Sequence, residues 1–288
     1  MALGDRPDGV RLRKLPGFRK IFPFLMRTRT ESAVYFSKRL QVAPTMAWLN
    51  RANAGREKKL SLFYVLLAAA VRTLALRPEV NRFVIGRRIY QRRTIDLSFV
   101  VKRELTEEAS EVTLKLTFDP RSTLDEVAAR VRGAIEKTRQ SETSWDENLT
   151  NFVTSLPRPV VRLAVACLRF LDYHGWLPAS FLRDDSLHTS VFVANLGSIG
   201  IDAGYHHMYE WGNASFFAVV GQLKKEPVVN ERGELEAAEV VDIKFTGDER
   251  ITDGVYFAKT MDLFVDLIRD PGRLETPPAD LPDPFALA

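Results

Sequence analysis

Gly247-Asp248-Glu249-Arg250-Ile251-Thr252-Asp253-Gly254 is a charged turn between a strand pattern and a helix pattern, and it decides the fold. Upstream, Val240–Phe245 is rich in β-branched and aromatic residues and predicts a strand. Downstream, Val255–Arg269 predicts a closing helix that ends before Pro271, because apolar residues recur along one face: Phe257, Met261, Phe264, Val265 and Ile268. The turn therefore joins a sheet to a helix that packs on it.

The rest of the chain mixes strands and helices without strict alternation. The 61–77 segment predicts a helix that is apolar on nearly every side and therefore buried, capped by Ser61 and stopped by Pro78. Thr123–Glu126 is a capping box that opens an amphipathic helix. Further strands are predicted at Ile95–Val101, Val112–Phe118, Ser190–Ala194 and Ser215–Gly221. These patterns favour an α/β fold, a two-layer sandwich with a mixed β-sheet, over a barrel.

Several blocks resemble one enzyme family in the correct order. Gly247–Gly254 resembles the Asp-His-Arg-x-x-Asp-Gly signature of the acyltransferase cores of 2-oxoacid dehydrogenase complexes, whose fold is that of chloramphenicol acetyltransferase. Val193–Gly200 is similar to the Ile-Ser-Asn-Leu-Gly block of that family. Further matching blocks are Leu67–Asn81, Ile95–Ser98 and Asp270–Leu274. The resemblance implies a chloramphenicol acetyltransferase-like fold and a homotrimer with active sites between subunits.

Two positions that the family uses for chemistry are altered. The resemblance implies a catalytic His where this chain has Glu249, and an oxyanion-stabilising Ser where it has Ala194. A carboxylate with a pKa of about 4.3 facing a thiol of about 8.5 is mismatched by roughly 5.7 kcal/mol for proton transfer. Losing one oxyanion donor costs about 10²–10³ in rate. Asp253 matches the residue that supports the family site, and we expect it to hold the turn rather than to catalyse.

Other residues could take part in a rebuilt site. His206 and His207 lie in a segment dense in polar aromatic residues, where Glu249 or Glu210 could orient one imidazole as a base. The alternative is that both histidines pack at the trimer interface or face solvent, and we favour it. We expect no metal site, because adjacent His side chains do not naturally face one ion. The resemblance implies a coenzyme A thioester as a candidate ligand, and we expect Asn195, Gly197 and Ser198 to contact it.

Composition and charge suggest three parts: a basic N-terminal arm at 1–30, an acyltransferase-like domain at 31–274 with a helical insertion at about 148–187, and a proline-rich tail at 275–288. The first sixty residues carry fourteen Lys/Arg against four acidic residues. We expect a solvated arm, or one that pairs with an acidic neighbouring subunit. Nucleic-acid binding is not favoured, because basic and aromatic residues do not interleave and no nucleic-acid motif is present.

The insertion contains the strongly apolar stretch Pro159–Leu171 with arginines near one helical face. We expect a helix buried within the oligomer. The alternatives are a helix on a membrane surface or a cap over an acyl tunnel. No window holds 18 uncharged apolar residues, so no membrane span is predicted. The single cysteine, Cys167, is expected to be buried; it excludes an internal disulfide framework and favours a cytoplasmic location.

Three functional hypotheses follow. The first is a non-catalytic trimeric scaffold or regulatory subunit, that is, a pseudoenzyme, whose trimers could assemble further. The second is an atypical coenzyme A-dependent acyltransferase rebuilt around His206, His207 and Glu249. The third, least favoured, is a membrane-surface protein. Because no lipoyl module is recognised, no lipoyl group is expected on this chain.

Overall fold

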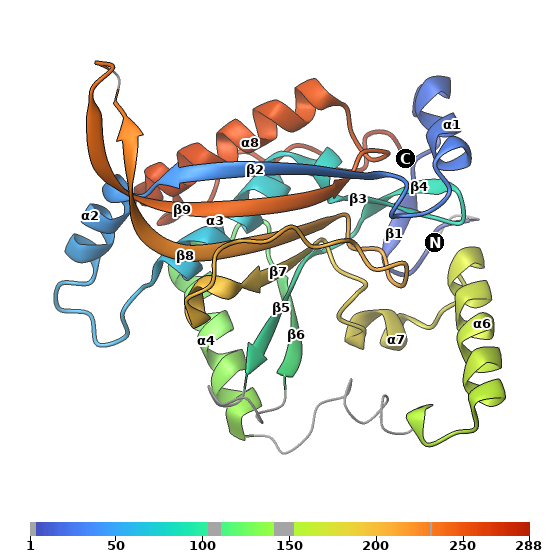
Figure 1. Cartoon of the computed structure of the whole chain (residues 1–288). Helices are drawn as coiled ribbons and strands as arrows, with labels where there is room; N and C mark the ends of the chain where they lie inside the picture. The colour runs from blue at the N-terminus through green and yellow to red at the C-terminus, as the bar shows by residue number, and fades with distance from the viewer. Residues whose placement is uncertain (1–3, 103–110, 141–152, 231) are drawn as a thin grey trace.

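The computed structural model describes residues 4–102, 111–140, 153–230 and 232–288. Its main sheet has the strand order β2-β9-β8-β7-β5-β6 (Figure 1). β7 runs parallel to both β5 and β8, whereas the other neighbouring strands are antiparallel. The predicted mixed sheet is therefore confirmed. The strands are β2 (Ala33–Gln41), β5 (Ile95–Lys102), β6 (Glu111–Phe118), β7 (Val191–Asn195), β8 (Phe216–Val229) and β9 (Leu235–Asp248).

Helices cover one face of this sheet and enclose the main core: α2 (Ala43–Ala52), α3 (Leu62–Leu76), α4 (Leu124–Gln140) and α8 (Gly254–Arg269). α3 is buried along most of its length, as its apolar sequence predicts. The capping box is also confirmed, since the Thr123 N–H donates to Glu126 and the Glu126 N–H donates to the Thr123 hydroxyl. Ser61 stands at the N-cap of α3 but makes no side-chain capping bond, so that detail was wrong.

The opposite face of the sheet carries a smaller cluster of Phe192, Phe217 and Val219. Segments between β7 and β8 pack against this cluster through Leu196 and Ala203. Side chains alternate between faces along a strand, so neighbouring residues such as Phe216 and Phe217 belong to different layers. Phe216 therefore lies on the helix-covered face with the main core, and Phe217 lies on the opposite face.

The N-terminal segment is part of the fold. β1 (Gly9–Arg11), β4 (Arg88–Arg92) and β3 (Arg82–Ile85) form a second sheet, in the order β1-β4-β3. Arg6 is almost fully buried and binds Asp8 and Asp172, each at 2.8 Å. The solvated arm expected for residues 1–30 is therefore wrong around Arg6, because buried carboxylates pair with its charge. α1 (Gly17–Leu25) follows β1 (Figure 1).

The insertion forms the helices α6 (Arg158–His174) and α7 (Ala179–Asp184), so a helix is confirmed there. The expected burial of this helix is not seen in the single chain. Asp172 is the buried residue of α6, whereas large apolar residues such as Leu163 and Phe170 are exposed. Cys167 is exposed too, contrary to expectation. Among the described residues, no helix combines the length and the apolar character needed to cross a membrane.

The short 3-10 helices complete the fold: η1 (Pro78–Asn81), η2 (Leu196–Ile199) and η3 (Pro271–Leu274). The tail returns to the body of the protein, because the carbonyl of Leu287 accepts hydrogen bonds from the N–H groups of Arg13 and Lys14. The C-terminal tail therefore lies beside the segment that follows β1 of the second sheet.

Candidate functional site

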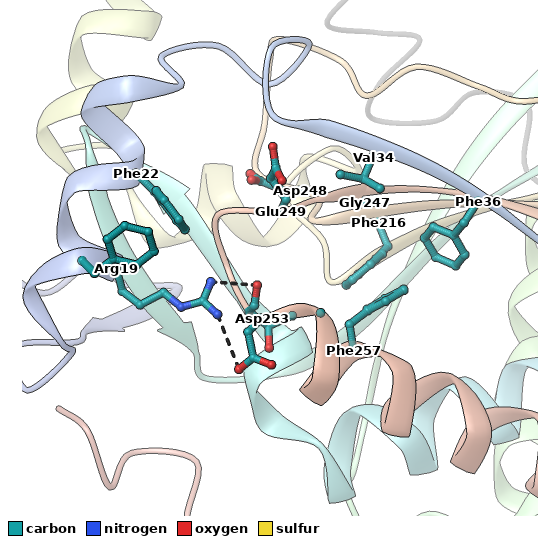
Figure 2. A pocket seen from close by; sticks show the side chains of 13 residues that line it. Arg19, Phe22, Val34, Phe36, Phe216, Gly247, Asp248, Glu249, Asp253 and Phe257 are labelled. Atoms are coloured by element: carbon teal, nitrogen blue, oxygen red, sulfur yellow. Dashed lines mark hydrogen bonds and ion pairs between the residues drawn. The ribbon is translucent and has the colours of Figure 1, made fainter.

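A cavity of about 600 Å³ lies beside the charged turn that follows β9 (Figure 2). Its walls come from α1, from β2 and β8, and from the turn between β9 and α8. The lining residues are mostly aromatic or acidic: Phe18, Arg19, Phe22, Val34, Phe36, Phe216, Gly247, Asp248, Glu249, Thr252, Asp253, Gly254 and Phe257. The turn that the sequence singled out therefore borders an open space large enough for a small ligand.

An ion pair within the turn fixes its backbone. Arg250 binds Asp248 through two hydrogen bonds, from Nε at 2.8 Å and from Nη2 at 2.6 Å. Both side chains are buried, and Nη1 of Arg250 also reaches the carbonyl of Met26. A bidentate pair of this kind sets the geometry of both residues. The Asp and Arg of the signature thus have a structural role here.

Glu249 projects from the same turn toward the cavity (Figure 2). Its N–H donates to the carbonyl of Ser32, which anchors the turn against the start of β2. The residue as a whole is exposed. Among the described residues, no side chain forms a hydrogen bond or ion pair with its carboxylate. Glu249 is held in place by its backbone, and its carboxylate is solvated.

Asp253 begins α8. Its carboxylate accepts a hydrogen bond from the Tyr256 N–H at 2.8 Å, as an N-cap does. This hydrogen bond, together with the nearby charge of Arg19, lowers the pKa of Asp253. The side chain is half exposed in its contact with Arg19. The structure therefore gives Asp253 the turn-holding role expected from the sequence.

Arg19 is the basic residue of the cavity, and the sequence did not indicate that it lies there. It reaches from α1 to the carbonyl of Thr252 at 2.8 Å and to the carboxylate of Asp253 at 3.5 Å (Figure 2). Its position depends on packing α1 across the chain onto the β9–α8 turn. The spacing of Phe18 and Phe22 could have indicated a helix there, but no local signal places that helix beside Glu249.

Aromatic rings form the far wall of the cavity. Phe36 meets Phe257 edge-on, with ring centroids 4.7 Å apart, and Phe216 stacks on Phe257 at 5.8 Å. Phe36 also stacks on Phe245 of the core at 5.0 Å. This wall favours apolar or aromatic groups over strongly hydrated ones.

Ala194 and the candidate cofactor contacts lie elsewhere in the protomer. Ala194 pairs with Val219, which pairs with Lys244, and Glu249 lies five residues farther along the chain. At about 3.4 Å per residue, Ala194 and Glu249 are separated by about 17 Å along the strands. The structure does not bring these two positions together within one protomer.

Asn195, Gly197 and Ser198 form a tight turn after β7. The Ser198 hydroxyl donates to the Asn195 carbonyl at 2.7 Å. A Cβ on Gly197 would lie 2.4 Å from the carbonyl oxygen of Gly221, so the turn packs closely on the backbone of β8. Glycine is required there by close packing, whatever the turn binds.

His206 and His207 lie away from Glu249. The His206 ring stacks on Phe217 at 4.0 Å, on the opposite face of the sheet from Phe216 and the cavity. Its Nδ1 faces the His207 carbonyl at 2.6 Å, and neither histidine lines the cavity. Within one protomer the rebuilt acid–His site is therefore not assembled.

Glu210, the other acid considered as a partner for a histidine, is used elsewhere. It accepts hydrogen bonds from the N–H and the hydroxyl of Thr30, at 2.9 and 2.7 Å. In the described part of the chain, no three His, Cys, Asp or Glu side chains gather as metal ligands.

Comparison with known proteins supports the resemblance. Residues 180–275 match the family described as 2-oxoacid dehydrogenases acyltransferase (catalytic domain). The resemblance inferred from the Asn-Leu-Gly block and the Gly247–Gly254 signature is therefore confirmed over this stretch. A search of curated proteins found no match.

Solved structures share the fold over most of the chain. A probable dihydrolipoamide acetyltransferase from Listeria monocytogenes is 14% identical with a TM-score of 0.58, covering 88% of this chain and 92% of that one. The cubic core of a pyruvate dehydrogenase multienzyme complex is 15% identical with a TM-score of 0.59, covering 90% of this chain and 88% of that one. A chloramphenicol acetyltransferase is 14% identical with a TM-score of 0.51, covering 88% of this chain and 94% of that one. The fold is that of chloramphenicol acetyltransferase, as the sequence predicted.

Proposed function

We propose that this chain is a non-catalytic scaffold or regulatory subunit, built as a trimer on the acyltransferase fold. The observation that carries the proposal is the solvated carboxylate of Glu249 at the family's base position, with no imidazole lining the same cavity. The Asp248–Arg250 pair maintains the turn without needing the reactive residue. A requirement for a stable turn accounts for the presence of Asp248 and Arg250 on either side of a residue, Glu249, that differs from the family's base.

The energetics support the same proposal. Transferring a thiol proton to a carboxylate is uphill by roughly 5.7 kcal/mol at ordinary pKa values. Glu249 is exposed, and no side chain among the described residues forms a hydrogen bond with its carboxylate to orient it toward a thiol. Ala194 has no hydroxyl to replace an oxyanion donor, a loss of about 10²–10³ in rate. The unfavourable proton transfer and the missing oxyanion donor together would make acyl transfer of the family's kind very slow.

A trimer fits the distribution of the candidate residues. Ala194 and Glu249 lie at different ends of the sheet, so a site that uses both needs two protomers. One structural neighbour is the cubic core of a multienzyme complex, and assembly of trimers into a larger particle is a further expectation. Light scattering at micromolar concentration tests this: we expect the trimer mass or a multiple of it, whereas a clean monomer contradicts the proposal.

A thiol-release assay with acetyl-coenzyme A and dihydrolipoamide tests the absence of catalysis. We expect the wild type and Glu249→Gln to match the background. Turnover of about 1–10³ per second in the wild type, abolished by Glu249→Gln, would contradict the proposal. The double variant Glu249→His, Ala194→Ser restores both family residues, and activity gained by it shows that the cavity still admits the substrates.

The cavity itself favours a second candidate function. About 600 Å³ of space between aromatic rings and Glu249 suits the acyl part of a coenzyme A thioester. An atypical acyltransferase would then need His206 or His207 from another protomer. Calorimetric titration with an acyl-coenzyme A distinguishes the readings: binding without turnover supports a regulatory subunit, and binding with turnover supports the enzyme.

A further inference from the structure

α1 exposes a stripe of large apolar side chains. Phe18 is 73% exposed and Leu25 is 62% exposed, and Ile21 and Phe24 are also exposed. Their spacing of three, three and one residues places all four on one side of the helix. Arg19 and Phe22 line the cavity beside Glu249, and Phe18 borders that cavity as well as belonging to the stripe. Ile21, Phe24 and Leu25 do not line the cavity, so most of the exposed stripe adjoins the candidate site without being part of it.

α6 exposes a second apolar stripe. Leu163 is 66% exposed, and Val160 and Phe170 are exposed on the same side of the helix. Trp176, just beyond the end of the helix, is 62% exposed and packs edge-on against Phe170 with ring centroids 5.9 Å apart. Large apolar side chains of this kind are rarely left in water without a binding role when they are contiguous.

A basic groove of about 690 Å³ links the two helices. It is lined by Pro23 near the end of α1, by the β3–β4 hairpin and by Arg169 and Tyr173 near the end of α6. Both helices lie on the same side of the molecule in Figure 1. The stripes of α1 and α6 and this groove are together called the α1–α6 surface.

Three exposed arginines surround the groove: Arg27, Arg87 and Arg169. Among the described residues, none of them forms an ion pair with a carboxylate. Arg87 lies 5.6 Å from the centroid of the Phe24 ring, so basic and apolar groups adjoin directly. Of the two acidic residues that line the groove, Asp172 is paired with Arg6, whereas Glu210 accepts hydrogen bonds from the neutral Thr30 and keeps its charge. Three exposed arginines against one carboxylate leave the groove with a net positive charge.

We propose that the α1–α6 surface binds the surface of an anionic lipid bilayer. Apolar side chains on amphipathic helices insert at the boundary between headgroups and acyl chains, and neighbouring arginines bind anionic headgroups. Trp176 and Tyr173 are the amphipathic aromatic residues typical of this boundary. A symmetric contact between two such surfaces would place arginines opposite arginines, so charge complementarity favours lipid over a second copy.

Flotation of the full chain with vesicles tests the proposal. We expect co-flotation with vesicles that contain phosphatidylserine and none with pure phosphatidylcholine at the same salt. The charge variant is Arg27→Gln, Arg87→Asn, Arg169→Gln; asparagine is chosen because residue 87 has a φ of 56°, which asparagine tolerates. Removing three basic residues near the membrane is expected to lower the partition coefficient on the order of 100-fold.

A control of equal net charge is Arg130→Gln, Lys137→Gln, Lys259→Gln, which removes three exposed basic residues from α4 and α8. It is expected to keep partitioning within about fivefold of the wild type, since those helices lie elsewhere. Equal losses in both triple variants would show attraction by net charge alone and would overturn the assignment to this surface.

The apolar contribution has its own pair of variants. Leu25→Ser, Leu163→Ser, Phe170→Ser removes exposed groups from α1 and α6, and Leu223→Ser, Val229→Ser, Leu235→Ser removes exposed groups from the β8–β9 hairpin. We expect flotation to be lost with the first set only, with unchanged circular dichroism in both. If the folded wild type fails to float, or if the first set changes the mass in light scattering without affecting flotation, the surface is not a lipid-binding one.

Discussion

Arg250 and Asp248 form a bidentate ion pair, with side chains only 3% and 0% exposed, inside the turn that carries Glu249. The pair closes the end of β9 and ties it to the carbonyl of Met26. A turn built in this way keeps its conformation independently of the residue between the two partners. This explains how the signature retains its Asp and Arg while its central residue is glutamate.

Replacing Asp248 by Ala leaves the guanidinium of Arg250 buried without its counter-ion. We expect a loss of about 3–5 kcal/mol in the free energy of unfolding, measured by denaturant titration. The matched control is Asp184→Ala, which breaks an ion pair with Arg183 at the surface and should leave the denaturant midpoint nearly unchanged. Similar losses in the two variants would contradict the structural role of the buried pair.

His188 makes stability depend on pH. Its ring is buried, with Nδ1 2.8 Å from Asp185 and Nε2 3.3 Å from Asp172. Burial lowers the pKa of His188, but the hydrogen bonds to Asp172 and Asp185 outweigh burial and raise it above the ordinary value. The resulting stabilisation is complete below about pH 6.5, the unfolded value, and is lost as pH rises through the folded-state pKa.

Asp185, which pairs with His188, gives the opposite dependence of stability on pH. Burial raises the pKa of Asp185, but the contacts with His188 prevail and lower it. Its stabilisation is present above about pH 3.9 and is lost as pH falls. We therefore expect this pair to stabilise the fold most between about pH 4 and 6.5. Unfolding titrations at several pH values should show a decline above this window in the wild type that His188→Gln lacks.

Asp253 can be tested as a helix cap. Asp253→Ala should lower the free energy of unfolding by about 1 kcal/mol, because the Tyr256 N–H loses its acceptor. Asp253→Ser keeps a capping oxygen and removes the charge, so it should stay within a few tenths of a kcal/mol of the wild type. A large loss with serine would point to the Arg19 contact instead of the cap.

Gly197 tests the turn after β7. An alanine Cβ there would lie 2.4 Å from the backbone oxygen of Gly221, and backbone cannot move aside easily. We expect Gly197→Ala to cost about 1–3 kcal/mol, the usual range for overpacking. Gly204→Ala is the control, because nothing lies within 4 Å of its added Cβ. Thermal melting of both variants measures the difference, and equal midpoints would contradict the close packing.

Local patterns determined much of this fold. The apolar run of α3 could only be buried, the Thr123–Glu126 capping box fixed the start of α4, and Pro271 lies just beyond the end of α8. Each of these signals acts between residues close in sequence, so it can be interpreted without knowing the rest of the chain. The family blocks extended the same information to the order of the strands.

Contacts between distant segments decided the site. The sequence identified Glu249, but only the packing of α1 brought Arg19 to Thr252 and made one wall of the cavity. His206 lies outside any strand and stacks on Phe217, which puts it on the face of the sheet opposite to Phe216 and the cavity. Its position depends on how the segment between β7 and β8 packs on the sheet, which the residues near it in sequence do not specify. Likewise, Arg6 is buried only because Asp172, 166 residues away, lies beside it. Periodicity specifies which side of an element is apolar, whereas what that side meets depends on chain topology.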